Sequence, residues 1–239
     1  MNKKGHFWGI GVGPGDPELL TMKAARILRE AGVIMAPKAT GRGESAALQA
    51  VKDLTDPSKL KIYDFPMTRD PENLAMCWRE VAAEIAELVD NGEQVVFLTL
   101  GDALTYSTLN YVLQQLQSKL EPGSITIIPG VTSFAAAAAA AGFPLVCGEE
   151  KLAVIPLPDG PLDSLRGQVR ESDVVVFMKL GSRLAELLEF IKEEFDGRET
   201  VFASRVGTPG QYLCRDLGDL PEDAAGYMSV LIVRKGGKA

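Results

Sequence analysis

The fold is decided first by residues 7–18, which read FWGIGVGPGDPE. Residues 7–11 have the composition of a buried strand, and they run into a loop with a glycine at every second position. Asp16, Pro17 and Glu18 then follow as a helix cap, a first-turn proline and a first-turn acid. Apolar residues recur at helical spacing from Leu20 to Ala31. The segment therefore predicts the first strand–loop–helix unit of an α/β protein.

The same alternation continues through the first half of the chain. Residues 95–100 are all apolar except for one threonine, which is typical of a parallel strand buried on both faces. A turn at residues 121–123, Glu-Pro-Gly, is the best candidate for a domain boundary. Further strands are expected at residues 33–36, ending at Pro37, and 60–65, and helices at 45–54, 74–88 and 109–116.

The second half has more strand and less helix, which predicts a mixed sheet. We therefore expect two α/β domains, residues 1–120 and 121–239. Strands are expected at residues 125–128, 152–157, 174–178, 201–205 and 227–233, together with an alanine-rich helix near 135–141 and a helix at 184–195.

Composition excludes several functions. The chain of 239 residues carries 25 Lys and Arg against 32 Asp and Glu, a formal net charge of −7, so a nucleic-acid partner is not expected. His6 is the single histidine, and a Ser-His-Asp triad or a His-rich zinc site would have to use it. We expect neither a triad nor a metal site.

The cysteines and the apolar runs indicate where the protein works. Cys77, Cys147 and Cys214 are odd in number and far apart, which favours reduced thiols in a cytoplasm over a disulfide framework. The first residues lack an apolar signal core, and the longest apolar run, 134–146, is too short to span a bilayer. We expect a cytoplasmic protein with no membrane partner.

The glycine loop does not match the dinucleotide fingerprint. That fingerprint needs glycines two and then three residues apart, and an acid at the end of the second strand. Here no gap of three exists, the second strand ends in Ala36-Pro37-Lys38, and Pro14 removes a backbone donor. NAD binding is disfavoured, and a tight turn without a ligand stays open as an alternative.

Two further loops resemble the first in composition. Residues 98–102, LTLGD, follow the most apolar strand and precede Tyr106-Ser107-Thr108, and residues 128–133, IPGVTS, follow another strand. Each alone is an ordinary turn more often than a site. Because ligands in open α/β folds collect at the carboxyl ends of strands, the three loops together predict one ligand site.

Taken in this order, the three loops resemble those of the tetrapyrrole methylases, a family that uses S-adenosylmethionine. The matching segments are GVGPGDPELLT at 11–21, LGD with YST at 100–108, and IPGVTS at 128–133. The resemblance covers essentially the whole chain. It implies two α/β domains of the tetrapyrrole methylase fold, a homodimer, and a cofactor held in a cleft between the domains, mainly by backbone groups.

Finer segments narrow the expected activity. APK at 36–38, FPMTRDPENL at 65–74 and ASRVGTPGQ at 203–211 are similar to those of the members that methylate C20 of precorrin-2 or of its cobalt-containing counterpart, in cobalamin biosynthesis. The alternatives are a ring methylase of the same family acting at a different carbon, a module that binds the cofactor without turnover, and a related methylase acting on a protein. The sequence does not separate a cobalt-containing from a metal-free substrate.

By matching motif, the resemblance assigns cofactor contacts to ten residues. Most members have proline at the position of Ala103, a change that we expect to affect loop stiffness more than binding. The acid that uroporphyrinogen methylases carry after the second strand is replaced here by Ala36-Pro37-Lys38, so no catalytic residue can be carried over at that point. The ten expected contacts are Pro14, Gly101, Asp102, Ala103, Tyr106, Thr132, Ser133, Met178, Gly207 and Thr208.

The chemistry and the charge of the substrate raise two separate questions. Methyl transfer from a sulfonium to an electron-rich ring carbon depends mainly on alignment, and Tyr106 or a water could take the proton that leaves C20. A precorrin carries eight carboxylates, so an acidic protein needs local cations to bind it. Lys38, Arg42 and Arg69 are expected to bind these carboxylates; the alternative is that they are solvated loop cations.

Overall fold

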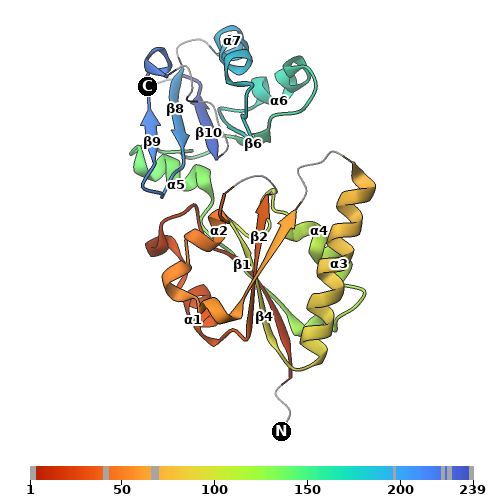
Figure 1. Cartoon of the computed structure of the whole chain (residues 1–239). Coiled ribbons are helices and arrows are strands. Elements are labelled where there is room, and N and C mark those ends of the chain that lie inside the picture. The colour runs from red at the N-terminus through yellow and green to blue at the C-terminus, as the bar shows by residue number, and fades with distance from the viewer. Residues whose placement is uncertain are drawn as a thin grey trace. The chain divides into compact units, whose positions relative to one another are not determined.

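The computed structural model describes residues 4–39, 43–65, 70–195, 198–221, 224 and 228–236. The chain divides into two units, Met1–Thr132 and Ser133–Ala239, and each is described by itself. Both units combine a sheet with helices (Figure 1). The prediction of two α/β domains is therefore confirmed.

The first unit is built on a parallel sheet with the strand order β3-β2-β4-β1-β5. β4 lies at its centre, and all of its residues except Gln94 are buried, as the apolar run at 95–98 predicts. The strands are β1 His6–Gly11, β2 Val33–Ala39, β3 Leu60–Phe65, β4 Gln94–Thr99 and β5 Ile125–Ile128.

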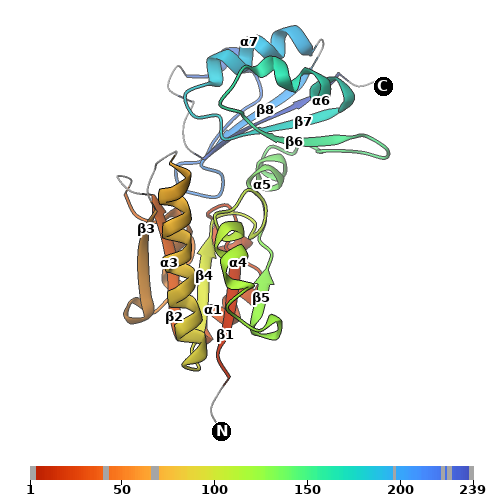
Figure 2. The same cartoon turned by 90° about the vertical axis from the view of Figure 1, so that its right-hand side faces the viewer.

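Helices cover both faces of this sheet. Successive residues of a strand point to opposite faces, so Phe7 and Phe97 pack under α3 and α4, whereas Ile10 and Leu98 pack under α1 and α2. Figure 1 shows the two pairs of helices on opposite sides of the strands, and Figure 2 shows α3 and α4 in front of them. The helices are α1 Met22–Glu30, α2 Ala46–Gln49, α3 Pro71–Asp90 and α4 Leu109–Leu116.

The first helix begins later than the sequence predicts. Asp16 does cap a helix, but only the short 3₁₀ helix Pro17–Leu19, because Leu20 has an extended backbone with φ −71° and ψ 137°. Thr21 then caps α1 by accepting a hydrogen bond from the backbone N–H of Ala24 at 3.2 Å. Two successive capping residues therefore divide a pattern that predicted one helix.

The second strand also runs past the proline at which it was expected to end. β2 pairs with β4 only from Val33 to Met35, whereas Pro37 lies opposite Tyr63 of β3. A proline cannot donate to a ladder, but at this position only one neighbouring strand remains. The predicted end at Ala36 was therefore wrong.

The second unit contains a mixed sheet with the order β6-β7-β10-β8-β9. β6 is parallel to β7, while β10 is antiparallel to both β7 and β8, so β7 and β8 end at the same edge. α6 and α7 pack on one face, and α5 contacts β8 and β10. The elements are α5 Ser133–Ala140, β6 Leu152–Pro156, α6 Arg166–Glu171, β7 Val174–Met178, α7 Leu184–Glu194, β8 Glu199–Ser204, β9 Tyr212–Cys214 and β10 Ser229–Arg234.

The boundary between the units lies after the predicted position of 120/121. β5 follows the Glu-Pro-Gly turn but pairs with β1, so it completes the first sheet and does not begin the second. The units divide between Thr132 and Ser133 instead. The turn runs into a short 3₁₀ helix, Pro122–Ser124, which leads into β5.

Candidate functional site

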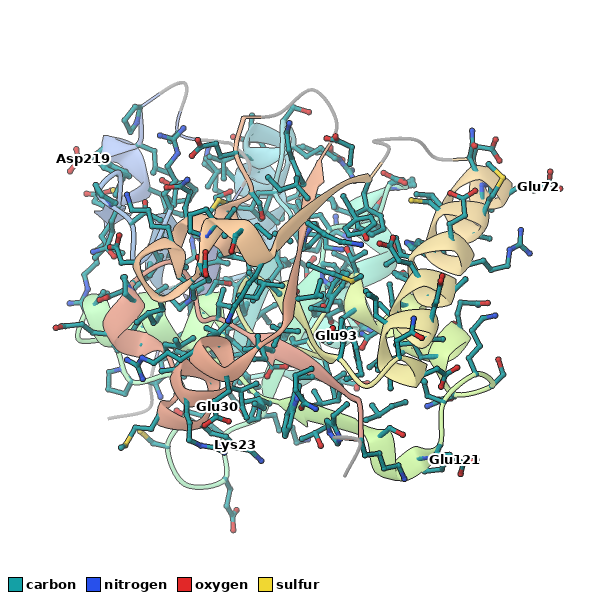
Figure 3. The ribbon with its side chains drawn as sticks, turned by 60° about the horizontal axis from the view of Figure 1, so that its bottom comes forward. Lys23, Glu30, Glu72, Glu93, Glu121 and Asp219 are labelled. Carbon is teal, nitrogen blue, oxygen red and sulfur yellow. The ribbon has the colours of Figure 1, made fainter. Side chains whose placement is uncertain are left out.

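Three loops meet at the carboxyl edge of the first sheet. β4, β1 and β5 are adjacent and parallel, so the loops that follow them leave the sheet at one edge. Figure 3 labels Glu72, in the first turn of α3, together with Glu93 and Glu121, which precede β4 and β5 in the sequence. The sequence prediction that the three loops lie together is confirmed.

The loops after β1 and β4 are joined through their main chains. The N–H of Gly13 donates to the carbonyl of Gly101 at 3.1 Å, and the N–H of Gly101 donates to the carbonyl of Gly13 at 2.7 Å. Both residues have a positive φ, 77° and 75°, which glycine adopts at no steric cost. Two of the predicted glycines are therefore required by backbone conformation.

The third loop fits against the other two because it also has a glycine. A Cβ added to Gly11 would lie 2.7 Å from the carbonyl oxygen of Gly101 and 2.7 Å from the amide nitrogen of Gly130. A Cβ added to Gly130 would collide with the same carbonyl oxygen of Gly101 and lie 2.6 Å from that of Gly11. The edge is thus lined by closely packed backbone, which leaves no room for side chains at these positions.

Asp102 ties the second loop to the third. Its Oδ1 accepts hydrogen bonds from the N–H of Leu104 at 3.0 Å and from the N–H and hydroxyl of Thr105 at 3.0 and 2.8 Å. Its Oδ2 accepts from the N–H of Gly130 at 3.2 Å. Partial burial raises the pKa of this carboxyl, but the hydrogen bonds from Thr105, Leu104 and Gly130 outweigh burial and lower the pKa below its ordinary value. Asp102 therefore stays ionised near neutral pH, and its carboxylate holds the second and third loops together.

The remaining predicted residues of the first unit surround this cluster. Pro14 and Ala103 are buried, and Thr132 is half-buried at the end of the third loop. Tyr106 is 44% exposed and has a φ of 52°, an unfavourable conformation for a residue with a Cβ. Among the described residues, no atom lies within 4 Å of a Cβ added to Gly101, so the main chain there borders open space.

Sequence reasoning placed Tyr106-Ser107-Thr108 as a cap for the next helix but missed the hydrogen bond between Thr99 and Ser107 beneath the second loop. The hydroxyls of Thr99 and Ser107 are 2.9 Å apart and both residues are buried. The Ser107 hydroxyl also accepts from the N–H of Leu109 at 3.1 Å, so Ser107 makes the capping hydrogen bond at the start of α4. A polar residue at the end of an apolar strand and a serine before a helix were the available signals.

The other predicted cofactor residues lie in the second unit. Ser133 begins α5, and Met178 ends β7, where it pairs with Val230. Gly207 and Thr208 follow β8 in a turn: Thr208 donates from its N–H and its hydroxyl to the carbonyl of Arg205, at 3.1 and 2.8 Å. Because β7 and β8 end at the same edge, Met178 and the turn lie at one edge of this sheet.

Of the three cations predicted to bind substrate, the structure describes only Lys38. Lys38 lies at the end of β2, and its Nζ is 3.6 Å from Oδ1 of Asp64, so it forms an ion pair within the protein. Arg42 and Arg69 lie outside the described residues.

The described residues contain neither a metal-binding cluster nor a helix suited to a membrane. In this part of the chain, no group of three His, Cys, Asp or Glu residues is placed to hold a metal ion. None of the described helices is both long and apolar enough to cross a membrane.

The chain belongs to the family of Tetrapyrrole (Corrin/Porphyrin) Methylases, whose model matches residues 6–221. This family assignment agrees with the order of the three loops and with the two α/β units.

The particular relatives are more informative about activity. The cobalt-precorrin-2 C(20)-methyltransferase of Salmonella typhimurium is 34% identical over 233 residues, which cover 97% of each chain. The crystal structure of the methyltransferase CobJ superposes with a TM-score of 0.72 and 25% identity, covering 97% of this chain and 94% of that one. A uroporphyrin-III C-methyl transferase from Thermus thermophilus, complexed with S-adenyl homocysteine, has a TM-score of 0.66 and 24% identity over 96% of this chain and 97% of that one.

Proposed function

We propose that this protein uses S-adenosylmethionine to methylate C20 of precorrin-2 or of its cobalt-containing counterpart in cobalamin biosynthesis. The proposal is supported by the full-length similarity to a cobalt-precorrin-2 C(20)-methyltransferase. The observation that carries it in the structure is the cluster of three backbone-lined loops at the carboxyl edge of the first sheet. The named activity of that relative favours the cobalt-containing substrate.

The residues of the cluster fit a cofactor that is held by main-chain groups. Gly101 is fixed by two hydrogen bonds to Gly13, and in the described part of the chain no atom lies within 4 Å of where its Cβ would be. A nucleoside and an amino acid both present donors and acceptors that backbone groups can bind. The ten residues assigned by the resemblance remain our proposed cofactor contacts, with Asp102 acting partly through the loops that it joins.

When bound, S-adenosylmethionine supplies an electrophilic methyl group. The task of the chain is then to hold the ring carbon and the methyl donor in line, because alignment can contribute several orders of magnitude in rate. Asp102 and the packed glycines serve this task by fixing the loops before a ligand arrives. The proton that leaves C20 is accepted by Tyr106 or by water, and Tyr106→Phe distinguishes the two: a kcat lowered at least tenfold assigns the proton to Tyr106.

We further propose that the protein is a cytoplasmic homodimer. Three free cysteines, Cys77, Cys147 and Cys214, are consistent with a reducing compartment. A groove of about 830 Å³ runs between α4 and the edge strand β5. Among the described residues that line it, none is charged, so two copies of an acidic chain could meet there without like-charge repulsion. The lining residues are Leu104, Asn110, Leu113, Gln114, Gln117, Leu120, Pro122, Ile125 and Ile127.

The dimer is tested by Leu113→Asp, which places a charge in the groove. Light scattering coupled to size exclusion should give two copies for the wild type and one for the variant, with unchanged far-UV circular dichroism. A wild-type monomer at all concentrations would remove the dimer, and a dimeric Leu113→Asp variant would remove the groove as its interface.

The activity is tested by an anaerobic assay with a ¹³C-labelled methyl donor and either metal-free precorrin-2 or its cobalt complex. Mass spectrometry should show the addition of one methyl group, and NMR should place the label at C20. A label on another ring carbon would assign the protein to a different methylase of the family. Binding of the donor without any product would contradict catalysis.

A further inference from the structure

The carboxyl edge of the second sheet carries an unusual concentration of left-handed backbone. Lys179 directly follows β7, Arg205 directly follows β8, and Met228 directly precedes β10, with φ values of 58°, 49° and 69°. The N–H of Arg205 donates to the carbonyl of Met228 at 2.9 Å, so two of the three conformations are locked together. Residues with a Cβ adopt this region at a cost, and such residues gather at functional sites.

Arg205 differs from every other arginine in its unit. Six arginines have acceptors or aromatic partners: Arg166 and Arg170 bind Glu194, Arg183 binds Glu186, Arg198 binds the carbonyl of Phe195, Arg215 binds the carbonyl of Gly142, and Arg234 binds Glu150. Among the described residues, the guanidinium of Arg205 has no such partner; the side chain is exposed, and the residue directly follows β8, an interior strand of the sheet. The unit therefore uses its other arginines in its own structure and leaves this one available.

The position of the side chain connects it to the predicted cofactor turn. The Cδ and Nη1 atoms of Arg205 lie 3.3 and 3.5 Å from where a Cβ of Gly210 would be. Two hydrogen bonds hold the turn that follows Arg205. The hydroxyl of Thr208 donates to the carbonyl of Arg205, and the N–H of Gly207 donates to Oε1 of Gln211 at 2.9 Å. Arg205 thus presents its charge beside the turn that contains Gly207 and Thr208.

A second cation lies at the same edge. The register places Met178 opposite Val230 and Ser204 opposite Ser229, so Lys179 and Arg205 are separated by the single strand β10. Two strand spacings put their backbones about 10 Å apart. Both side chains are exposed.

We propose that Arg205 binds a carboxylate of a ligand held at the carboxyl ends of β7 and β8, with Lys179 as a secondary cation. The inference rests on the proposed function, because both of its ligands carry carboxylates: the methionine part of the cofactor has one, and a precorrin has eight. A guanidinium pairs with a carboxylate through two parallel hydrogen bonds. In an acidic chain, this arginine supplies the local positive charge that such a ligand needs.

The test compares Arg205→Gln, Arg205→Lys and the control Arg26→Gln, which removes the same charge from an exposed ion pair on α1. Three probes are titrated into each protein: S-adenosylhomocysteine, methylthioadenosine, which lacks the amino acid part, and cobalt-precorrin-2. We expect Arg205→Gln to weaken one carboxylate-bearing probe about 10- to 100-fold, Arg205→Lys to recover part of that loss, and Arg26→Gln to change nothing.

The probes identify the source of the carboxylate. A loss for S-adenosylhomocysteine but not for methylthioadenosine places the methionine carboxylate at Arg205, whereas a loss for cobalt-precorrin-2 alone places a ring carboxylate there. Unchanged affinity for all three probes, in a variant with the wild-type melting temperature, would overturn the inference. If the wild type itself binds none of the probes, the proposed function fails instead. If Arg205→Gln does not fold, Arg205→Lys decides, because it keeps the charge but loses the paired hydrogen bonds and should still weaken the same probe.

Discussion

Replacing Asp102 by Asn should weaken the hydrogen bond that connects the second loop to the third. Asn can still accept through Oδ1 from Leu104 and Thr105, but its amide nitrogen would then face the N–H of Gly130, which Oδ2 of Asp102 binds at 3.2 Å. Two donors would therefore oppose each other where a charged acceptor now lies. A hydrogen bond to a charged group contributes about 1.5–3 kcal/mol, so we expect a loss of about 2 kcal/mol in the free energy of unfolding.

The assay is urea denaturation of Asp102→Asn beside Thr105→Val. The valine variant loses only the 2.8 Å hydroxyl contact to Oδ1 and keeps the bond to Gly130, so it should lose about 1 kcal/mol. Affinity for S-adenosylhomocysteine should fall about tenfold in Asp102→Asn, because the third loop is no longer held. The reasoning is refuted if Asp102→Asn is no less stable than Thr105→Val, or if it binds the ligand as tightly as the wild type.

The same carboxylate predicts a pH dependence. The pKa of Asp102 in the folded protein lies below its ordinary value of 3.8. Its stabilising contribution is therefore complete above pH 3.8 and is lost as the pH falls through the folded pKa. The stability difference between the wild type and Asp102→Asn should be constant from pH 5 to 7 and shrink in stronger acid; a difference that grows as the pH falls would contradict this sign.

Three further changes test packing and electrostatics. Gly130→Ala should cost roughly 1–3 kcal/mol in the free energy of unfolding, because the new Cβ meets backbone atoms. Its control is Gly123→Ala, whose Cβ meets open space among the described residues. In the same urea titration, the control should change the free energy of unfolding by less than about 0.5 kcal/mol. Glu84→Gln should cost about 1 kcal/mol in the free energy of unfolding at pH 7, a value limited by solvent screening of the ion pair between Glu84 and Lys61. Burial raises the pKa of Glu84, but hydrogen bonds from Lys61 and Tyr63 of β3 outweigh burial and lower this pKa. The stability difference between wild type and variant should therefore vanish as the pH falls below 4.5. Trp78→Phe should change stability by less than about 1 kcal/mol, because it keeps a ring stacked on Tyr111 while removing a buried N–H that has no acceptor among the described residues; a loss of about 3 kcal/mol would contradict this expectation.

The order of strands, loops and helices along the chain could be predicted from the sequence because each element depends mainly on residues that are neighbours in the sequence. The run at 95–100, apolar except for Thr99, predicted the central strand, and Gly13 and Gly101 occur where the backbone needs a positive φ. The domain boundary could not be predicted in this way. β5 joins the first sheet because Phe7 aligns with Ile125, which is a pairing between residues more than a hundred positions apart.

The same distinction applies to the candidate site. The loops were found from their composition, but the hydrogen bond from Gly130 to Asp102 spans 28 residues and leaves no pattern in the sequence. Arg205 was passed over for a similar reason. What distinguishes Arg205 is that the other arginines of its unit have acceptors within the protein. Those acceptors are set by tertiary contacts, such as that between Arg234 and Glu150, which the sequence does not reveal.

The backbone lining of the first unit's loops has a consequence for how such an enzyme can diverge. Gly11, Gly13, Gly101 and Gly130 offer main-chain atoms, which substitutions in neighbouring side chains leave in place. If these loops hold the methyl donor as proposed, its recognition can persist through extensive sequence drift, while preference for one ring carbon changes through side chains elsewhere. An inhibitor that copied only the main-chain contacts would leave few routes to resistance, since escape would require a change in one of four residues that cannot accept a Cβ without backbone strain or collision.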